Sequence, residues 1–419
     1  MKVFKFGGAS VKDAESLKNV ANILREFEGE SLIVVVSAMG KTTNKLEQIL
    51  ASIHQVNKGE FKILLNELKN FHDKIITSLN LDSHQVLSSA LGSYYFNIRE
   101  IFEDYKVSEF NFNYDKIVSF GELISTQIVA AYLEKCNFNS IWLDASLLIK
   151  TDDKFRSATV NLPTTTSNIK TALEPFNDEK KLVVTQGFIG STDDGEITTL
   201  GREGSDYSAA IFAYCLNAES LTIWKDVDGM YNADPKKFPK AQKLETISYK
   251  DAIELSYYGA SVIHPKTIQP LQNKDIPLYV KSFIHPKLSG TTITKDRRNQ
   301  IPCYIIKENQ VLVSLSTKNF SFIAEKHLAN IFKAYDSLDM KINIMQNSAV
   351  NFSALFDNKQ FDENKVLSSF SNNYAVRYNE NLELITIRHY NKAIIDELLE
   401  NREVLLEQKT RETVRFVVK

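Results

Sequence analysis

The stretch "VFKFGGASV", residues 3–11, indicates which kind of fold to expect. It is an apolar, β-type run that carries one lysine, Lys5, and it ends in the paired glycines Gly7 and Gly8, with Ser10 just beyond. In open α/β sheets, ligands bind beyond the carboxyl ends of the strands, where glycines let backbone N–H groups approach a phosphate. We therefore predict that Lys5 is aimed at a phosphate. The alternative from the local sequence is a buried lysine that snorkels to solvent.

Four more short apolar runs extend this strand into a sheet. Residues 32–36 and 182–185 end at a Gly, Ser or Gln cluster and are followed by helical periodicity, which is typical of buried parallel strands. Residues 221–224 and 278–281 add two further strands. Apolar spacings of three and four predict helices between the second and third strands, at residues 44–55, 61–79 and 83–105. The predicted fold is α/β, with a mainly parallel central sheet and a large helical insertion.

Bulk composition favours small-molecule chemistry. The chain has 419 residues, of which 43% are hydrophobic and 24% charged, and its formal net charge is -2. This balance gives no electrostatic reason to expect nucleic acid or an anionic membrane as a partner. The three cysteines are far apart in the sequence and odd in number, which fits a reducing compartment better than a disulfide framework. No apolar run reaches the roughly 20 residues of a membrane span, so we expect a cytoplasmic protein.

The composition becomes polar and turn-rich at residues 285–302, which indicates a domain boundary. The chain beyond it predicts a βαββαβ unit of about 70 residues, followed by a shorter cycle that lacks a final helix and strand. We interpret these as two related ferredoxin-like α+β modules, the second truncated, with an open edge that a neighbour should cover. Separate strands are expected at residues 311–316, 375–378 and 382–387. The expected domains are residues 1–295, 303–380 and 381–419.

"SAMGKTTN", residues 37–44, follows the second strand directly and contains a GKT triplet. A nucleotide P-loop needs a further glycine upstream, with four residues between it and the GK pair, and Val35 holds that place. We therefore reject a Walker motif. The hydroxyl groups of Ser37 and Thr43 either hold a small substrate or cap the next helix.

"SFGELIST", residues 119–126, places Glu122 inside an apolar stretch. A carboxylate in such a setting is costly unless it is paired. Glu122 is therefore either a ligand for a cationic group or a structural bridge.

"TLGREGSDYSAA", residues 199–210, opens a helix that we expect to begin near Ser205. Arg202, Gly204 and Asp206 then crowd at its N-terminus with that serine. Backbone N–H groups and the helix dipole make this an anion-binding arrangement that carries its own acid. The alternative is that Asp206 only caps the helix.

"WKDVDGMYNADPKKFPKA", residues 224–241, follows another strand. Asp226, Tyr231 and Lys236 lie in a polar loop wide enough to wrap a nucleotide. The loop lacks the glutamate that closes a calcium loop, and the seven histidines show no paired ligand spacing. We therefore predict no metal site built by the protein alone.

Taken together, these stretches resemble the aspartate kinase family, and the C-terminal part resembles that family's paired ACT regulatory modules. They occur in the family's order and spacing, as KFGGASV at 5–11, SAMGKTTN at 37–44, SFGEL at 119–123, TLGREGSDYSAA at 199–210, DVDGMYNADP at 226–235 and YYGASVIHP at 257–265. The resemblance implies an amino acid kinase fold, with ATP and Mg²⁺ as cofactors. It also implies phosphoryl transfer from ATP to the side-chain carboxylate of L-aspartate, the first step of lysine, threonine and methionine biosynthesis.

The resemblance also implies roles for individual residues. The catalytic residues would be Lys5, Asp206 and Lys225. The residues that bind aspartate would be Ser37, Thr43, Glu122, Arg202, Gly204 and Ser205. The residues that bind ATP would be Lys5, Gly7, Gly8, Ser10, Lys225, Asp226, Tyr231, Lys236, Ser261 and Val262.

Two departures from the family pattern affect the predicted charge of the site. Glu203 stands where the family often has glycine, so its carboxylate either points outward or adds repulsion to the loop. Ser261 stands where the family often has a lysine, and losing a cation beside the phosphates should slow the reaction. We hypothesise that Lys225 supplies the missing charge.

The segment "INIMQNSAVNFS", residues 342–353, matches the strand and turn that bind lysine or threonine in regulated members of the family. Asn343, Asn347 and Ser348 would then contact an amino-acid effector. Ala349 replaces a frequent glutamate that could pair with a lysine effector. The alternative is that these modules only join two chains, as a homodimer or a higher homo-oligomer.

Two other functions remain open from the sequence. An acetylglutamate or glutamate kinase would share the glycine-rich fold, but it would not explain the helical insertion, SFGEL or the ACT-like tail. A catalytically inactive amino-acid sensor on the same scaffold is the second alternative. The joint presence of Lys5, Glu122, Arg202 and Asp206 argues against such a sensor.

Overall fold

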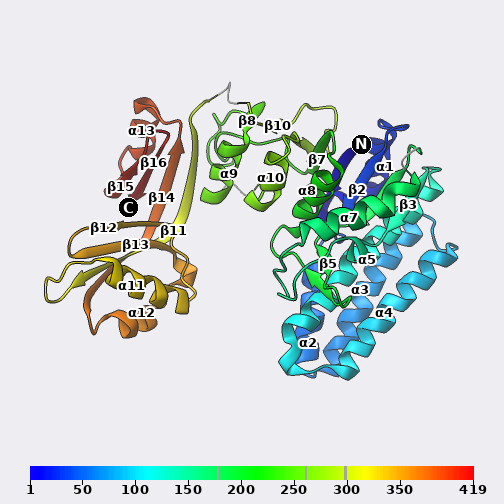
Figure 1. Cartoon of the computed structure of the whole chain (residues 1–419), viewed down its shortest axis with the longest axis horizontal. Coiled ribbons are helices and arrows are strands. Elements are labelled where there is room, and N and C mark those ends of the chain that lie inside the picture. Colours follow the sequence, from blue (N-terminus) through cyan, green and yellow to red (C-terminus); the bar gives the residue numbers. More distant parts are fainter. Residues whose placement is uncertain (177–178, 260–261, 297–299) are drawn as a thin grey trace. The chain divides into compact units, whose positions relative to one another are not determined.

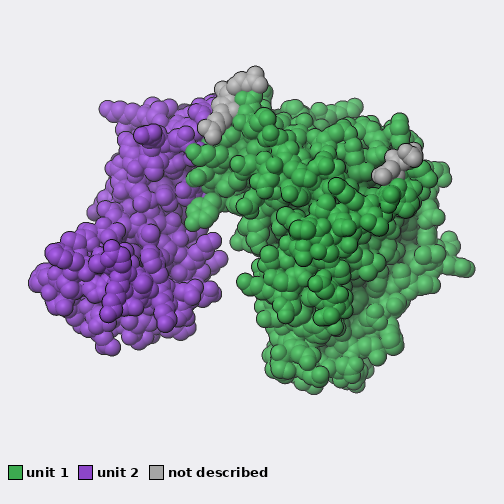
Figure 2. All heavy atoms as spheres, in the orientation of Figure 1, with its two compact units in different colours: residues 1–230, 243–257, 261–299 green, residues 231–242, 258–260, 300–419 purple. Residues whose placement is uncertain are grey.

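The computed structural model describes residues 1–176, 179–259, 262–296 and 300–419. The chain forms two compact units, which Figure 2 shows in different colours. The first unit comprises residues 1–230, 243–257 and 261–299, and the second comprises residues 231–242, 258–260 and 300–419.

The first unit is built on an eight-stranded sheet with the order β3-β4-β2-β1-β7-β9-β10-β8 (Figure 1). Its strands are β1 (Lys2–Phe6), β2 (Leu32–Val36), β3 (Ser140–Leu143), β4 (Leu182–Gln186), β7 (Ser220–Lys225), β8 (Thr246–Ser248), β9 (Leu278–Ser282) and β10 (Thr291–Thr294). All neighbouring strands run parallel except β9 and β10, which are antiparallel. The predicted α/β fold with a mainly parallel sheet is confirmed.

The predicted phosphate-facing strand is central in this sheet. β1 pairs in parallel with β2 on one side and with β7 on the other, so that Phe6 lies opposite both Val36 and Trp224. All five residues of β2 are buried, as expected for a continuous Leu-Ile-Val run. The carboxyl ends of β1, β2 and β7 therefore meet at one edge of the sheet.

The helices of the first unit are α1 (Ala14–Arg25), α2 (Thr42–His54), α3 (Lys58–Ser78), α4 (Gln85–Asp104), α5 (Phe110–Lys135), α6 (Ala145–Leu148), α7 (Leu162–Leu173), α8 (Gly204–Leu216), α9 (Tyr249–Tyr258) and α10 (Pro265–Gln272). The three predicted insertion helices correspond to α2, α3 and α4, which form the blue and cyan group in Figure 1. Within the described ranges, every helix is too short or too polar to span a lipid bilayer.

Helix α5 escaped the sequence analysis although it is 26 residues long. Buried residues occur on all sides of it, from Ile117 to Leu133, so its sequence shows no apolar stripe. The helix contacts β2, β3 and β4. A short hairpin of β5 (Ile189–Ser191) and β6 (Ile197–Thr199) packs beside it.

The second unit contains an antiparallel six-stranded sheet with the order β12-β13-β11-β14-β16-β15. Its strands are β11 (Cys303–Thr317), β12 (Ile344–Asn347), β13 (Asn351–Asp357), β14 (Tyr374–Arg388), β15 (Val404–Lys409) and β16 (Thr413–Val418). Its helices are α11 (Glu325–Ser337), α12 (Glu363–Phe370) and α13 (Lys392–Leu399).

The second module does not lack the strand that the sequence analysis found missing. The strands expected at residues 375–378 and 382–387 form one continuous strand, β14, so a boundary at residue 380 falls inside it. The first part of β11, which begins at Cys303, pairs with the last part of β14, where Tyr304 lies opposite Ile387. The second module thus receives its fourth strand from a segment that precedes the first module in the chain.

Residues 231–242 cover part of the second module's core. Ala233, Phe238 and Ala241 pack in the same apolar cluster as Tyr304 and Ile385. The rings of Phe238 and Tyr304 meet edge to face at 4.8 Å between centroids. This loop, which the sequence suggested as a nucleotide wrap, covers apolar surface of the second module.

Candidate active site

A cavity of about 610 Å³ in the first unit brings together side chains from distant parts of the sequence. It lies at the carboxyl ends of the central strands, because Lys5 is on β1, Ser37 follows β2 and Lys225 ends β7. The predicted site residues that line it are Lys5, Gly8, Ser37, Thr43, Glu122, Arg202, Gly204, Ser205, Asp206 and Lys225.

Two lysines share one buried carboxylate in this cavity. The Lys5 Nζ is 2.6 Å from Asp206 Oδ1, and the Lys225 Nζ is 3.2 Å from Asp206 Oδ2. Burial alone would raise the pKa of Asp206, but the charges of Lys5 and Lys225 outweigh it and hold the pKa below its usual value. Asp206 therefore stays ionised and fixes both ammonium groups at the ends of two adjacent strands.

Glu122, on α5, is buried and only half satisfied. Its Oε1 accepts a hydrogen bond from the Ala38 N–H at 3.3 Å, whereas its Oε2 is buried without a hydrogen-bond partner in the described part of the chain. Burial raises the pKa of Glu122 to about 8, although the Ala38 hydrogen bond and the charge of Lys5 oppose this. Burial thus keeps the carboxyl largely protonated at neutral pH, and a cationic ligand would ionise it.

The turns after β1 and β2 touch each other at Gly8. A Cβ at this position would lie 2.6 Å from the Ala38 carbonyl oxygen, so no side chain fits. The Gly40 N–H donates to the Gly8 carbonyl at 3.0 Å. Both turns therefore present backbone to the cavity.

The cavity also contains the N-terminus of α8, which begins at Gly204. Arg202 lies just before it and is exposed. In the part of the chain that the structure describes, its guanidinium has no ion-pair partner. A free guanidinium beside the first N–H groups of a helix forms an anion-binding arrangement.

Glu203 does not point outward. It lines the cavity, its backbone is left-handed with φ 54°, and its Oε2 is buried without a hydrogen-bond partner among the described residues. The loop therefore carries a negative charge next to Arg202, which is the second of the two expectations for this residue.

Several predicted ATP-binding residues are not among the lining residues. Gly7 lies beside the Lys5 ammonium, since a Cβ there would be 3.4 Å from Nζ. Ser10 is buried, Asp226 is exposed next to Lys225, and the Val262 carbonyl accepts a hydrogen bond from Lys225 Nζ. Tyr231 and Lys236 belong to the second unit, and Ser261 lies outside the described residues. Their roles stay predictions.

The sequence analysis missed three side chains that line the cavity, Tyr114, Arg156 and Phe188. Tyr114 belongs to α5, which had no recognisable apolar stripe. Arg156 lies in a loop without a glycine or a motif to mark it. Phe188 follows Gly187 in a stretch that was read mainly for its glycines. Arg156 and Phe188 both have a positive φ, which distinguishes them in the structure but cannot be recognised from the sequence.

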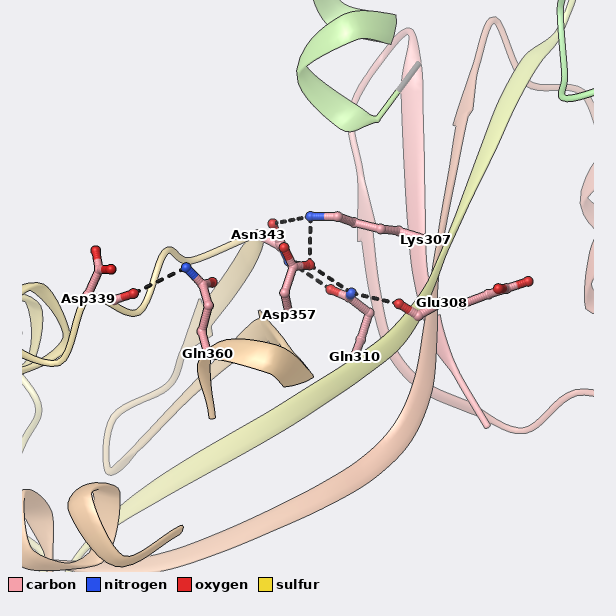
Figure 3. A network of polar contacts seen from close by, with 7 residues as sticks. All are labelled: Lys307, Glu308, Gln310, Asp339, Asn343, Asp357 and Gln360. Carbon is pink, nitrogen blue, oxygen red and sulfur yellow. Dashed lines mark hydrogen bonds and ion pairs between the residues drawn. The ribbon is translucent and has the colours of Figure 1, made fainter. Parts of the chain in front are cut away.

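Figure 3 shows that the predicted effector residue Asn343 takes part in a polar network of the second unit. Its Oδ1 accepts from Lys307 Nζ at 2.9 Å, and its Nδ2 donates to Gln310 Oε1 at 2.7 Å and to Asp357 Oδ1 at 3.0 Å. The Lys307 ammonium also pairs with Asp357 at 2.7 Å. The side chain of Asn343 is therefore fully engaged, whereas Asn347, the last residue of β12, and Ser348, on the turn that follows, are exposed.

A sequence model of the Amino acid kinase family matches residues 1–282. Aspartokinase 1 of Arabidopsis thaliana, a chloroplastic protein, is 32% identical over 368 residues, which cover 85% of this chain and 63% of the relative. Lysine-sensitive aspartokinase 3 of Escherichia coli is 30% identical over 357 residues, covering 85% of this chain and 78% of that relative. The chain thus spans less than two thirds of the length of the plant relative.

The fold is similar to that of E. coli aspartokinase III. The crystal structure of that protein with lysine and aspartate, described as the T-state, superposes with a TM-score of 0.85 and 27% identity, covering 100% of this chain and 96% of the other. Its complex with aspartate and ADP, described as the R-state, gives a TM-score of 0.83 over the same shares. These similarities cover both units of the chain.

Proposed function

Since the chain belongs to the amino acid kinase family and groups there with the aspartokinases, we propose that it transfers the γ-phosphoryl group of ATP to the side-chain carboxylate of L-aspartate. The products are 4-phospho-L-aspartate and ADP. The observation that carries this proposal is the Lys5–Asp206–Lys225 cluster, which shares one cavity with Arg202 and Glu122.

The acceptor amino acid would bind on the Glu122 side of the cavity. Its ammonium group would contact the buried Glu122 carboxyl, whose Oε2 has no hydrogen-bond partner among the described residues. The carboxyl would lose its proton on binding, because the ammonium charge favours the ionised form. Arg202 would bind a carboxylate through its planar guanidinium. Ser37, Thr43, Gly204 and Ser205 would supply hydroxyl and backbone hydrogen bonds.

In the transfer step, a side-chain carboxylate oxygen of aspartate attacks the γ-phosphorus, and the bond between that phosphorus and the bridging oxygen of ADP breaks. No proton needs to move, because the attacking group is already ionised. Lys5 and Lys225 would neutralise charge on the transferring phosphoryl group, and Asp206 holds both lysines in place. Such chemistry depends on positioning and charge more than on covalent help.

Mg²⁺ would enter with ATP as part of the nucleotide substrate. Among the described residues, no group of three or more His, Cys, Asp or Glu side chains could hold the ion alone. Both oxygens of Asp206 face lysines, which fits an ion held chiefly by phosphates. Bound in this way, the ion would supply further neutralisation of phosphate charge.

The nucleotide would lie over the turn after β1. Gly7, Gly8 and Ser10 would present backbone N–H groups and a hydroxyl to its phosphates. The other proposed contacts are Lys225, Asp226, Tyr231, Lys236, Ser261 and Val262, which stay predictions from the family resemblance.

Release of ADP, measured with different acceptors, tests the proposed function. We expect ADP formation that requires both ATP and L-aspartate, with little activity on L-glutamate or N-acetyl-L-glutamate. A preference for either glutamate substrate would establish the rival kinase assignment. No ADP formation with any acceptor, despite binding of an amino acid, would establish the inactive sensor.

For regulation, we propose an amino-acid effector site in the second unit, with lysine as the first candidate because E. coli aspartokinase III was solved with lysine. The engaged side chain of Asn343 leaves Asn347 and Ser348 as the predicted contacts. Inhibition by lysine or threonine in the ADP assay would support the site. A flat response to both amino acids would leave the modules with a purely oligomeric role.

A further inference from the structure

Arg156 lines the same cavity as Arg202 but belongs to none of the stretches that suggested a site. Its guanidinium carbon lies 4.5 Å from the centroid of the Tyr114 ring, and the Tyr114 hydroxyl donates to Glu47 Oε1 at 2.7 Å. Stacking on an aromatic ring orients a guanidinium without consuming its N–H donors. Within the described ranges, no hydrogen bond or ion pair occupies those donors.

The backbone at Arg156 is strained, and the strain is enforced by buried contacts. Its φ is 70°, a region that arginine rarely adopts. The Arg156 N–H donates to Asp115 Oδ2 at 2.9 Å, and the same buried carboxylate accepts from the N–H and Oγ1 of Thr199 at 2.8 and 2.7 Å. The fold therefore fixes the position of Arg156 firmly enough to hold an unfavourable conformation.

This kind of strain is concentrated at the cavity. Most described non-glycine residues with positive φ are Asn or Asp, and the others are Val56, Arg156, Phe188, Glu203, Phe320 and His389. Three of these six line the cavity. Strained positions that cluster at one site point to a functional constraint.

The loop of Arg156 touches the loop of Arg202. A Cβ on Gly201 would lie 3.2 Å from the Arg156 carbonyl oxygen and 3.3 Å from Ser157 Oγ. Gly201 directly precedes Arg202, so adjoining loops carry the two guanidinium groups. The reacting carboxylate of the acceptor must lie near Lys5 and Lys225. Arg156 is not part of that cluster, so it is available for the carboxylate that does not react.

We propose that Arg156 is a second guanidinium of the amino-acid subsite and binds the non-reacting α-carboxylate of the acceptor together with Arg202. This inference rests on the proposed function. The cationic charge of the cavity agrees with it: Asp206 partly neutralises Lys5 and Lys225, but no described carboxylate pairs with either arginine. The two arginines can therefore share the α-carboxylate, while the reacting carboxylate lies near Lys5 and Lys225.

The test compares the wild-type enzyme with Arg156→Gly, on L-aspartate and on its α-amide. Glycine suits the positive φ, so the variant should melt no lower than the wild type. We expect the KM for aspartate to rise at least about tenfold, with the KM for ATP nearly unchanged. Because the α-amide lacks the α-carboxylate, its KM, or its inhibition constant where turnover is too slow to measure, should be the same in both enzymes.

A matched control is Val56→Gly, which relieves a positive φ of 54° at an exposed position that does not line the cavity. It should leave both KM values unchanged. An equal loss on aspartate and α-amide in Arg156→Gly, or no loss on either, would overturn the role of Arg156. Failure of the wild-type enzyme to form ADP with aspartate would instead overturn the proposed function.

Discussion

At the scale of single residues, the site depends on how burial and charge set protonation states. Asp206 and Glu122 are both buried carboxylates in one cavity, yet their pKa values shift in opposite directions. Two lysines face Asp206 and keep it ionised, while Glu122 has one hydrogen bond and no cation in contact. This contrast is what the proposed function needs, since phosphate would lie beside the two lysines and an ammonium group beside Glu122.

Glu122 should make aspartate binding depend on pH. Its pKa of about 8 means that the carboxyl must lose a proton before it can pair with the substrate ammonium. The KM for aspartate should therefore fall as the pH rises from 6 to 8, by up to about tenfold per unit. Steady-state kinetics across this range measure the effect, and Glu122→Gln should flatten the profile while binding aspartate weakly. A wild-type KM that is independent of pH would contradict this role of Glu122.

The same shift has a consequence for stability. The folded-state pKa of Glu122 lies above the ordinary glutamate value of 4.5, so the folded protein binds the proton more tightly than the unfolded chain does. Its contribution to stability is present below pH 4.5 and is lost as the pH rises towards 8. Glu122→Gln should therefore gain stability relative to the wild type between these pH values, as thermal unfolding would show.

Glu203→Gly should improve the site that it borders. The substitution removes a negative charge beside Arg202. It also removes a buried carboxylate oxygen that has no hydrogen-bond partner among the described residues, and it relaxes a φ of 54°. We expect a KM for aspartate that is a few-fold lower, and a free energy of unfolding up to about 1 kcal/mol higher. Glu203→Gln separates the two effects, because it removes only the charge. A raised KM in both variants would show that Glu203 helps to bind the substrate.

Lys225→Ala tests whether this lysine supplies charge to the transferring phosphoryl group. Loss of one cation from a buried cluster should lower kcat by about a hundredfold. Lys281→Ala is a matched control, because that lysine lies on the adjacent strand β9 and stacks over Trp224 without lining the cavity. Turnover of Lys225→Ala near the wild-type value would remove the hypothesis.

At the scale of elements, the sequence predicted best where a strand or helix has one regular face. Short apolar runs marked the strands β1, β2, β4, β7 and β9. Apolar spacings of three and four marked the amphipathic helices α2, α3 and α4. The long helix α5 was not, because it is buried on all sides. Glu122 could still be singled out, since a lone carboxylate in an apolar stretch is informative without knowledge of the element.

Pairing between distant segments could not be predicted. Cys303–Lys307 was assigned to the first module, but it completes the sheet of the second. Residues 231–242 cover the second module's core, although they were assigned to the catalytic domain. Nothing local in either segment indicates its partner. Arg156 was missed for a related reason, because its position depends on the hydrogen bond of its backbone to Asp115.

Phe238→Ala tests the role of residues 231–242 in the second unit. The ring is half-buried against Tyr304, so its removal should lower the free energy of unfolding by about 1–3 kcal/mol. Phe320 is 82% exposed, and Phe320→Ala should change stability by less than about 0.5 kcal/mol. Chemical denaturation of both variants gives the comparison. Equal effects of the two substitutions would mean that residues 231–242 do not stabilise this unit.

At the scale of the whole molecule, the chain combines a unit with the amino acid kinase fold and a unit built on a six-stranded antiparallel sheet. All the residues that line the cavity belong to the first unit, whereas the proposed nucleotide contacts Tyr231 and Lys236 belong to the second. Residues 231–242 belong to the second unit but follow β7, whose last residue is Lys225. Along the sequence, the chain therefore passes into the second unit at Tyr231, soon after Lys225.

The most direct measurement of the central claim is to trap the product with hydroxylamine, which converts an acyl phosphate to a hydroxamate. With ATP and L-aspartate, the wild-type protein should yield β-aspartyl hydroxamate in a one-to-one ratio with ADP, and Asp206→Asn should yield almost none. ADP formation without hydroxamate, or at the same rate without aspartate, would contradict the account.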